Sequence, residues 1–211
     1  MDMIWVIREI CAEENGFANL FDRETSYDTL IGLADNPKEA EQFAQLLYGY
    51  ARGTLLELIQ DAYHHTEHAE NVISALTGDG MSRAEAIRTL QIFYEAFGFP
   101  GYRFPDPAKV DTLITVDGDF RTEYTGEVRD GKEHGVGVRT CYYDGEFSSC
   151  DESVWVDGVM CGYDSAREME FGMYEDKKIG FVVNDSRVGK LRVLASSGEE
   201  FDDFGATLDI Q

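Results

Sequence analysis

The chain has 211 residues, of which 43% are hydrophobic and 12% aromatic, enough apolar material for the core of one or two small domains. Against 18 Lys and Arg stand 41 Asp and Glu, so the formal net charge is −23. Such a surface repels phosphate backbones and anionic lipids, which argues against nucleic-acid and membrane binding. No stretch approaches the ~18 apolar residues of a membrane span, and no signal-peptide core is present, so we expect a cytoplasmic protein.

The first half is predicted to be a small helical bundle over residues 1–99. An opening helix is expected over 3–14 and another over 67–76. Three more helices begin at signatures in which a small polar residue caps free N–H groups and a Glu three positions later caps back. These signatures are Asn36 to Glu39, Thr54 to Glu57 and Ser82 to Glu85. Five short helices, each with one apolar face, should pack as a compact bundle.

Residues 19–98 also resemble a helical module that recurs in multidomain bacterial proteins. The resemblance is carried by Asn19-Leu20-Phe21, by the segment 80–86, and by Phe93 and Phe97 near the end of the last helix. It implies a bacterial protein in which this half has a scaffold or adaptor role.

Prolines mark the boundary between the two halves. Pro100, Pro105 and Pro107 interrupt any helix that would run through this segment. We therefore predict a linker over residues 100–108, between a helical domain (1–99) and a second domain (109–211), and expect limited proteolysis to cut there.

The second half has the alternation of strands. Phe120, Thr122 and Tyr124 recur at period two, and glycines with similar neighbours recur along this half. The expected fold class is thus α+β, with a helical bundle followed by an antiparallel sheet. An ordinary sheet whose Asp-Gly hairpins imitate a repeat is the alternative.

The clearest repeat copy lies in residues 124–138 and closes at Asp144-Gly145. It has an aromatic-Gly opening, an Asp130-Gly131 turn and His134-Gly135-Val136-Gly137. This pattern resembles the MORN repeat, a β-hairpin unit, and weaker copies follow at 155–162 and 171–181. Gly131 should adopt positive φ, and Gly135 and Gly137 should leave room for aromatic rings of the neighbouring hairpin. The glycines with an expected structural role are Gly126, Gly131, Gly135, Gly137, Gly145, Gly158 and Gly162.

Three motifs resemble known sites, and each has a plainer interpretation. Residues 64–68 read H-x-x-E-H, an inverted zinc-protease motif, but Thr66 is better placed as a helix cap, which favours a polar interhelical turn. Residues 126–132 fit G-x-x-x-x-G-K, but Glu133 stands where Ser or Thr is required. Asp117 and Asp119 lack the spacing of a calcium loop. The four cysteines form no metal-binding or disulfide pattern, so we predict free thiols, no metal, no cofactor and no catalytic residues.

MORN-like proteins are usually scaffolds or adaptors, so the resemblance implies a non-enzymatic protein-interaction module. The alternative is an acidic inhibitor, such as a bacterial immunity protein or nucleic-acid mimic, whose charge suits a basic partner. An enzyme of unrecognised type is a third possibility. The partner is expected to be a protein, and the sheet edges offer a route to a homodimer. The candidate interaction residues are Tyr124, Tyr142, Tyr143, Phe147, Trp155, Phe171 and Tyr174.

Overall fold

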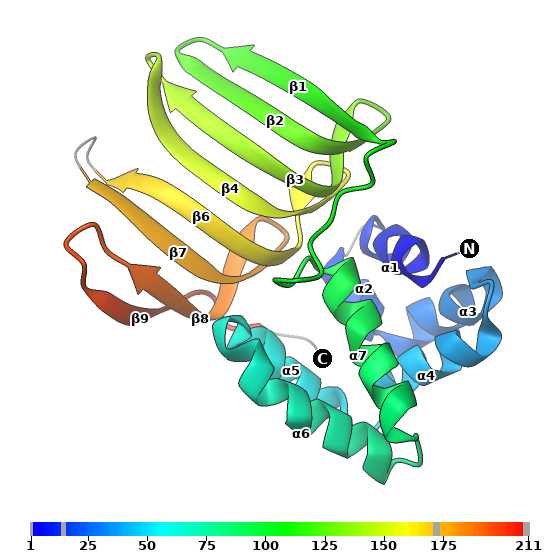
Figure 1. The fold of residues 1–211 in the computed structure, drawn as a ribbon. Coiled ribbons are helices and arrows are strands. Elements are labelled where there is room, and N and C mark those ends of the chain that lie inside the picture. Colours follow the sequence, from blue (N-terminus) through cyan, green and yellow to red (C-terminus); the bar gives the residue numbers. More distant parts are fainter. Residues whose placement is uncertain (1, 14–15, 171–173, 209–211) are drawn as a thin grey trace.

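The computed structural model describes residues 2–13, 16–170 and 174–208, and it confirms the α+β class. Within those residues, seven α-helices and one short 3-10 helix precede nine strands. Figure 1 shows the helices gathered at one end of the strands. The helices are α1 (Met3–Cys11), α2 (Phe17–Phe21), α3 (Arg23–Leu33), α4 (Pro37–Tyr48), α5 (Arg52–Gln60), η1 (Ala62–His64), α6 (His65–Gly78) and α7 (Arg83–Ala96).

Two of the three predicted helix caps are present. Asn36 accepts the N–H of Glu39 at the start of α4, and Ser82 forms a full capping box with Glu85 at the start of α7. The cap predicted at Thr54 is wrong, because α5 begins at Arg52. The Thr54 hydroxyl instead donates to the carbonyl of Ala51 at 2.8 Å, so it does not cap the free N–H groups.

Helices α2 and α3 were not predicted. The five residues of α2 are too few to show a helical repeat, yet three of them, Phe17, Leu20 and Phe21, are fully buried. Asp22 then caps α3 by accepting the N–H of Glu24 at 3.0 Å. The bundle therefore has more helices than the five that the sequence predicted.

The strands form one antiparallel sheet in nearly sequential order, β1-β2-β3-β4-β6-β7-β8-β9, with β5 paired to β4. Consecutive strands such as β1 and β2, β2 and β3, or β7 and β8 form antiparallel hairpins (Figure 1), as expected for a meander of hairpin units. The strands are β1 (Val110–Asp117), β2 (Phe120–Arg129), β3 (Lys132–Tyr143), β4 (Glu146–Val156), β5 (Val159–Met160), β6 (Gly162–Glu170), β7 (Tyr174–Val183), β8 (Ser186–Leu194) and β9 (Glu200–Phe204).

Asp-Gly pairs close the predicted hairpins. In Asp130-Gly131, Asp144-Gly145 and Asp157-Gly158 both residues have positive φ, the feature that distinguishes a type I′ turn and matches the twist of the flanking strands. The weaker copy at 171–181 begins at residues 171–173, which lie outside the described residues, and its described part contains no hairpin turn at Asp176. Residues 174–183 are one continuous strand, and the chain reverses at Asn184-Asp185, where both φ values are again positive.

The glycines of the first repeat make room for different groups than expected. A Cβ at Gly137 would lie 2.5 Å from Cε2 and Cζ of Tyr124, which belongs to the same hairpin rather than the next. A Cβ at Gly126, opposite Gly137 in the register, would lie against the Cα of Gly137 and 2.6 Å from the hydroxyl oxygen of Tyr124. Gly135 has φ +68 and faces the carboxylate of Glu127, not an aromatic ring. Gly126 and Gly137 therefore leave room for the side chain of Tyr124 on this face of the hairpin.

The change from helices to strands falls within the predicted linker, but the hydrophobic core is continuous across it. Phe99 is fully buried, and its ring lies 5.3 Å from Tyr163 and 5.9 Å from Phe181, both in the sheet. The N–H of Tyr163 donates to the carbonyl of Phe97 at 2.8 Å, and Arg103 donates to the carbonyls of Gly98 and Tyr163. The sheet and the helices therefore share one core, which joins the two predicted domains.

Candidate interaction surface

Two of the predicted interaction residues belong to the core. Tyr124 and Trp155 are fully buried, with ring centroids 5.2 Å apart in an edge-to-face arrangement. The Tyr124 hydroxyl donates to the carbonyl of Glu127 at 2.9 Å. Their assignment to a binding surface is wrong. Aromatic side chains next to glycines pack over the exposed backbone of those glycines, so Tyr124 and Trp155 are buried within the chain itself and are not accessible to a partner.

Three others remain accessible at the far ends of the strands. Tyr143 is 60% exposed and pairs with Phe120 at a ring distance of 6.3 Å, whereas Tyr142 and Phe147 are half-buried. Phe171 lies outside the described residues. Tyr174 is the first residue of β7, and its side chain is not described.

Tyr142 and Phe147 lie opposite each other on β3 and β4 and form the centre of a row across the sheet. Arg121 of β2 is opposite Tyr142, with its guanidinium 5.9 Å from the ring centroid, and Val116 of β1 is opposite Arg121. On the other side, the guanidinium of Arg167 in β6 lies 5.8 Å from the centroid of Phe147. We call these five side chains the aromatic row.

The register places the aromatic row on the same sheet face that packs against the helices. Val154 of β4 is fully buried on this face, at the end of the strand nearest the helices. Phe147 is seven residues away along β4, about 20 Å at the rise of a strand, and the bulge beside Cys141 and Tyr142 turns it to the same face. The helices cover one end of this face, while Val116, Arg121 and Arg167 stay exposed at the other end. Strand alternation alone missed the two arginines, because only the cross-strand register shows what they face.

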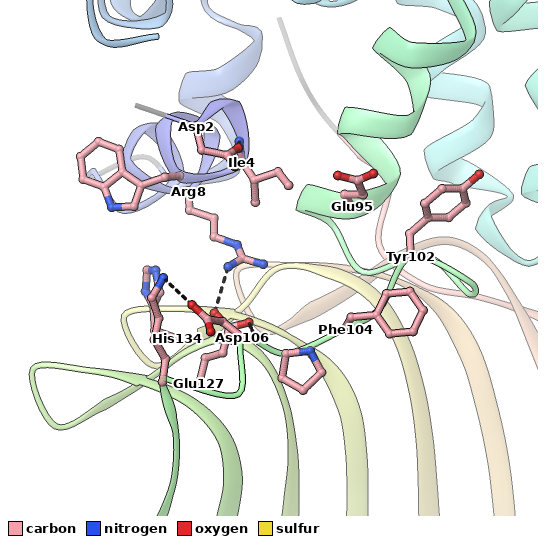
Figure 2. A pocket seen from close by; sticks show the side chains of 12 residues that line it. Asp2, Ile4, Arg8, Glu95, Tyr102, Phe104, Asp106, Glu127 and His134 are labelled. Carbon is pink, nitrogen blue, oxygen red and sulfur yellow. Dashed lines mark hydrogen bonds and ion pairs between the residues drawn. The ribbon is translucent and has the colours of Figure 1, made fainter. Parts of the chain in front are cut away.

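A second accessible feature is a pocket of about 330 Å³ between α1, the end of α7 and the linker. Figure 2 shows Arg8 reaching from α1 toward Glu127 and Asp106, with Tyr102 and Phe104 on one side. Phe104 is 75% exposed, so it is the accessible apolar wall of this pocket.

The base of the pocket is an ion pair that joins the helices to the sheet. Arg8 Nη1 lies 3.2 Å from Oε2 of Glu127, and the other carboxylate oxygen of Glu127 accepts the N–H of Asp106 at 3.0 Å. Burial lowers the pKa of Arg8, and the charge of Glu127 partly offsets this effect. Both carboxylate oxygens of Glu127 are bonded, so this group holds the structure together rather than acting as a free base.

The lone histidine of the pocket is a weak base. Burial, followed by the charges of Arg129 and Arg8, lowers the pKa of His134 to about 4. Its Nδ1 lies 3.4 Å from the backbone N–H of Asp157, which donates to it. A neutral imidazole with this pKa takes up protons poorly at neutral pH, which does not favour general-base catalysis.

The histidine motif at 64–68 lies at the junction of η1 and α6. His64 is the N-terminal flank of α6 rather than Thr66, which lies inside the first turn, so the predicted cap at Thr66 is wrong. His64 Nδ1 and His68 Nε2 lie 2.8 and 3.5 Å from the two carboxylate oxygens of Asp61. Burial alone would raise the pKa of Asp61, but these hydrogen bonds outweigh it and lower that pKa.

A buried carboxyl on the opposite sheet face has a strongly raised pKa. Burial, reinforced by the charge of Asp151, raises the pKa of Asp164 to about 7. Arg187 bonds Asp164 at 3.4 Å and Glu168 at 2.7 Å. Perturbed carboxyls often mark active sites, but Asp164 has 0% exposure, so a substrate does not reach it. Its effect is on stability.

Among the described residues, no three His, Cys, Asp or Glu side chains are arranged to hold a metal ion. The four cysteines are free, and a hydrogen bond between Cys161 and Cys11, followed by burial, raises the pKa of Cys161. Within the described part of the chain, no helix has both the length and the apolar character needed to cross a bilayer.

A scan of protein-family models gives no match for this chain, and no curated protein matches it either. The resemblance to the MORN repeat therefore stays a prediction that rests on the residues quoted above.

Proposed function

We propose that the chain is a non-enzymatic interaction module, built on a sheet of MORN-like hairpins, that binds a protein partner through the aromatic row. The observation that carries the proposal is the position of Tyr142 and Phe147 at the centre of this row, on a part of the sheet that the helices leave uncovered. Aromatic and Arg side chains are the residues most enriched at the centres of protein interfaces.

The geometry of the row suits this role. Its side chains project from adjacent paired strands, so little backbone freedom is lost when a partner binds. The arginines flanking Tyr142 and Phe147 hold their rings by cation–π contact, and Arg121 also forms an ion pair with Glu123. A preorganised row loses less side-chain entropy on binding than separate flexible residues would.

The test is affinity capture from extract of the native cells, with the full chain as bait. The variant carries Tyr142→Ala and Phe147→Ala, and the control carries Tyr50→Ala, an aromatic residue that is 81% exposed on the helical side. We expect one or more proteins to bind the wild type and the control, with a dissociation constant raised more than tenfold in the double variant. Equal binding by all three chains, with an unchanged circular dichroism spectrum, would contradict the proposal.

The acidic-inhibitor alternative is favoured by the charge of −23 and by the pocket, whose lining includes the exposed ring of Phe104 and the acidic residues Asp2, Glu95 and Asp106, beside Arg8 and Lys109. This arrangement suits a Lys or Arg side chain of a basic protein, which would stack on the ring and meet carboxylates. The two candidates differ in their response to substitution and salt. Binding that survives Tyr142→Ala with Phe147→Ala, but falls with Phe104→Ser and with rising salt, would favour the inhibitor.

A further inference from the structure

We propose that two copies of this chain pair antiparallel through the free edges of β1, with Leu113 opposite Leu113 of the second copy. The inference does not rest on the proposed partner-binding function. It rests on the exposure of β1, on which of its backbone groups face outward, and on the self-complementary order of its residues.

Strand β1 is an edge strand, and within the described residues it pairs with β2 alone. Seven of its eight residues are exposed and Leu113 is half-buried, so no helix overhangs its free side. Ile114 and Val116 are 57% and 66% exposed. Natural edge strands are usually short, charged or interrupted by proline, whereas β1 is eight residues long, has neither Lys nor Pro within it, and carries only the two charges of Asp111 and Asp117. An edge of this kind is suited to pairing with another strand.

The backbone groups of the even-numbered residues face this free edge. Lys109, just before β1, accepts the N–H of Val128 at 3.1 Å in the register of the β1–β2 pair. Because bonded and non-bonded positions alternate in an antiparallel pair, residues 109, 111, 113, 115 and 117 bond to β2, and 110, 112, 114 and 116 do not. Consistent with this, the N–H of Thr112 donates to the side chain of Asp111 at 2.7 Å. A new strand can bond these outward N–H and C=O groups, and at Thr112 it would replace the carboxylate of Asp111 as the acceptor.

One register matches β1 to itself over its whole length. With Leu113 at the two-fold axis, Thr112 faces Ile114 of the second copy, and Val110 faces Val116 of the second copy. These are the outward-facing positions, so each pair can exchange two backbone hydrogen bonds. Asp117 then lies opposite Lys109 of the second copy, which gives two symmetric ion pairs. Shifting the axis to Ile114 would instead place Asp111 opposite Asp117, two like charges.

The other edge of the sheet does not match itself in this way. Strand β9 is five residues long, and Glu200, Asp202 and Asp203 make three of them acidic. Self-pairing of β9 would bring these carboxylates together. Pairing of β9 with β1 would be head-to-tail and would propagate into an open filament rather than close as a dimer. The net charge of −23 opposes dimerisation, but at physiological salt only charges within about 8 Å of the seam interact strongly.

The test is sedimentation equilibrium of the full chain over a range of concentrations at 0.15 M salt, with proline variants at the two edges. Thr112→Pro removes an outward N–H of β1 without removing a bond to β2. Phe204→Pro is the matched control on β9, because its N–H likewise donates to the preceding aspartate, Asp203, at 2.8 Å. We expect a dimer for the wild type and the control, and a dissociation constant more than tenfold higher for Thr112→Pro.

A charge swap tests the register. Lys109→Glu and Asp117→Lys should each weaken the dimer roughly tenfold, because each places like charges opposite one another twice per dimer. The double variant should restore wild-type affinity. A chain that stays monomeric at 1 mM, a dimer broken by Phe204→Pro but not by Thr112→Pro, or a double variant no better than the single ones would overturn the proposal.

Discussion

A single methyl group at Gly137 tests how the MORN-like hairpin is packed. In Gly137→Ala the new Cβ would lie 2.5 Å from Cε2 and Cζ of Tyr124, well inside van der Waals contact. Tyr124 is fully buried against Trp155, and its hydroxyl donates to Glu127, so the ring cannot move aside without cost. Overpacking of this kind costs about 1–3 kcal/mol, and loss of the hydrogen bond adds about 1 kcal/mol. We therefore expect a loss of about 3 kcal/mol in the free energy of unfolding.

Urea unfolding followed by tryptophan fluorescence measures this loss. Gly53→Ala is the control, because Gly53 lies in α5 with nothing within 4 Å of its added Cβ, and there alanine should be neutral or slightly stabilising. In a Tyr124→Leu background the cost of Gly137→Ala should fall by at least about 1 kcal/mol, since the clashing ring is gone. Equal costs of Gly137→Ala in both backgrounds would refute the packing described here.

Three further predictions follow from the junction and the buried charges. Arg8→Met leaves the carboxylate of Glu127 buried without its cation and should cost about 3–5 kcal/mol in chemical denaturation, whereas Lys38→Met breaks an exposed pair and should cost less than about 1 kcal/mol. The pKa of Asp164 is about 7 in the folded chain against an ordinary 3.8, so its protonation stabilises the fold below pH 4, and this stabilisation is lost as the pH rises through 7. The Asp164→Asn variant should therefore gain up to about 4 kcal/mol relative to the wild type between pH 4 and pH 8, and a pH-independent difference between the two would exclude this effect. Trypsin should cut first after the exposed Lys109 at the end of the predicted linker, and the two fragments should co-elute in native gel filtration and separate only in denaturant, because one core joins them.

The class of fold could be predicted because local signals are strong on both sides of the boundary. The capping box at Ser82 and the Asp130-Gly131 turn each depend on a few adjacent residues, and both are present. Helix α2 could not be predicted, because its stability comes from burying Phe17 against Phe181, which is far away in the sequence. Propensity says little about a five-residue segment that tertiary contacts hold in place.

The candidate surface could be predicted only in part, for a related reason. Alternation along a strand shows which residues share a face, but not which end of that face the helices cover. Tyr124 and Tyr142 look equivalent in the sequence. Tyr124 is nevertheless fully buried, whereas Tyr142 is half-buried at the end of the sheet far from the helices. The shared core also escaped prediction, because Phe99 lies next to a proline-rich segment that resembles a linker and yet is fully buried.

The central claim is that the aromatic row contacts a partner, and position-specific photo-crosslinking tests it most directly. A benzophenone amino acid replaces Tyr142 in one chain and Tyr50 in another, and both chains are irradiated in native cells. We predict a crosslinked protein from position 142 that is absent from position 50. Crosslinks from position 50 but not from position 142, or the same protein from both positions with equal yield, would contradict it.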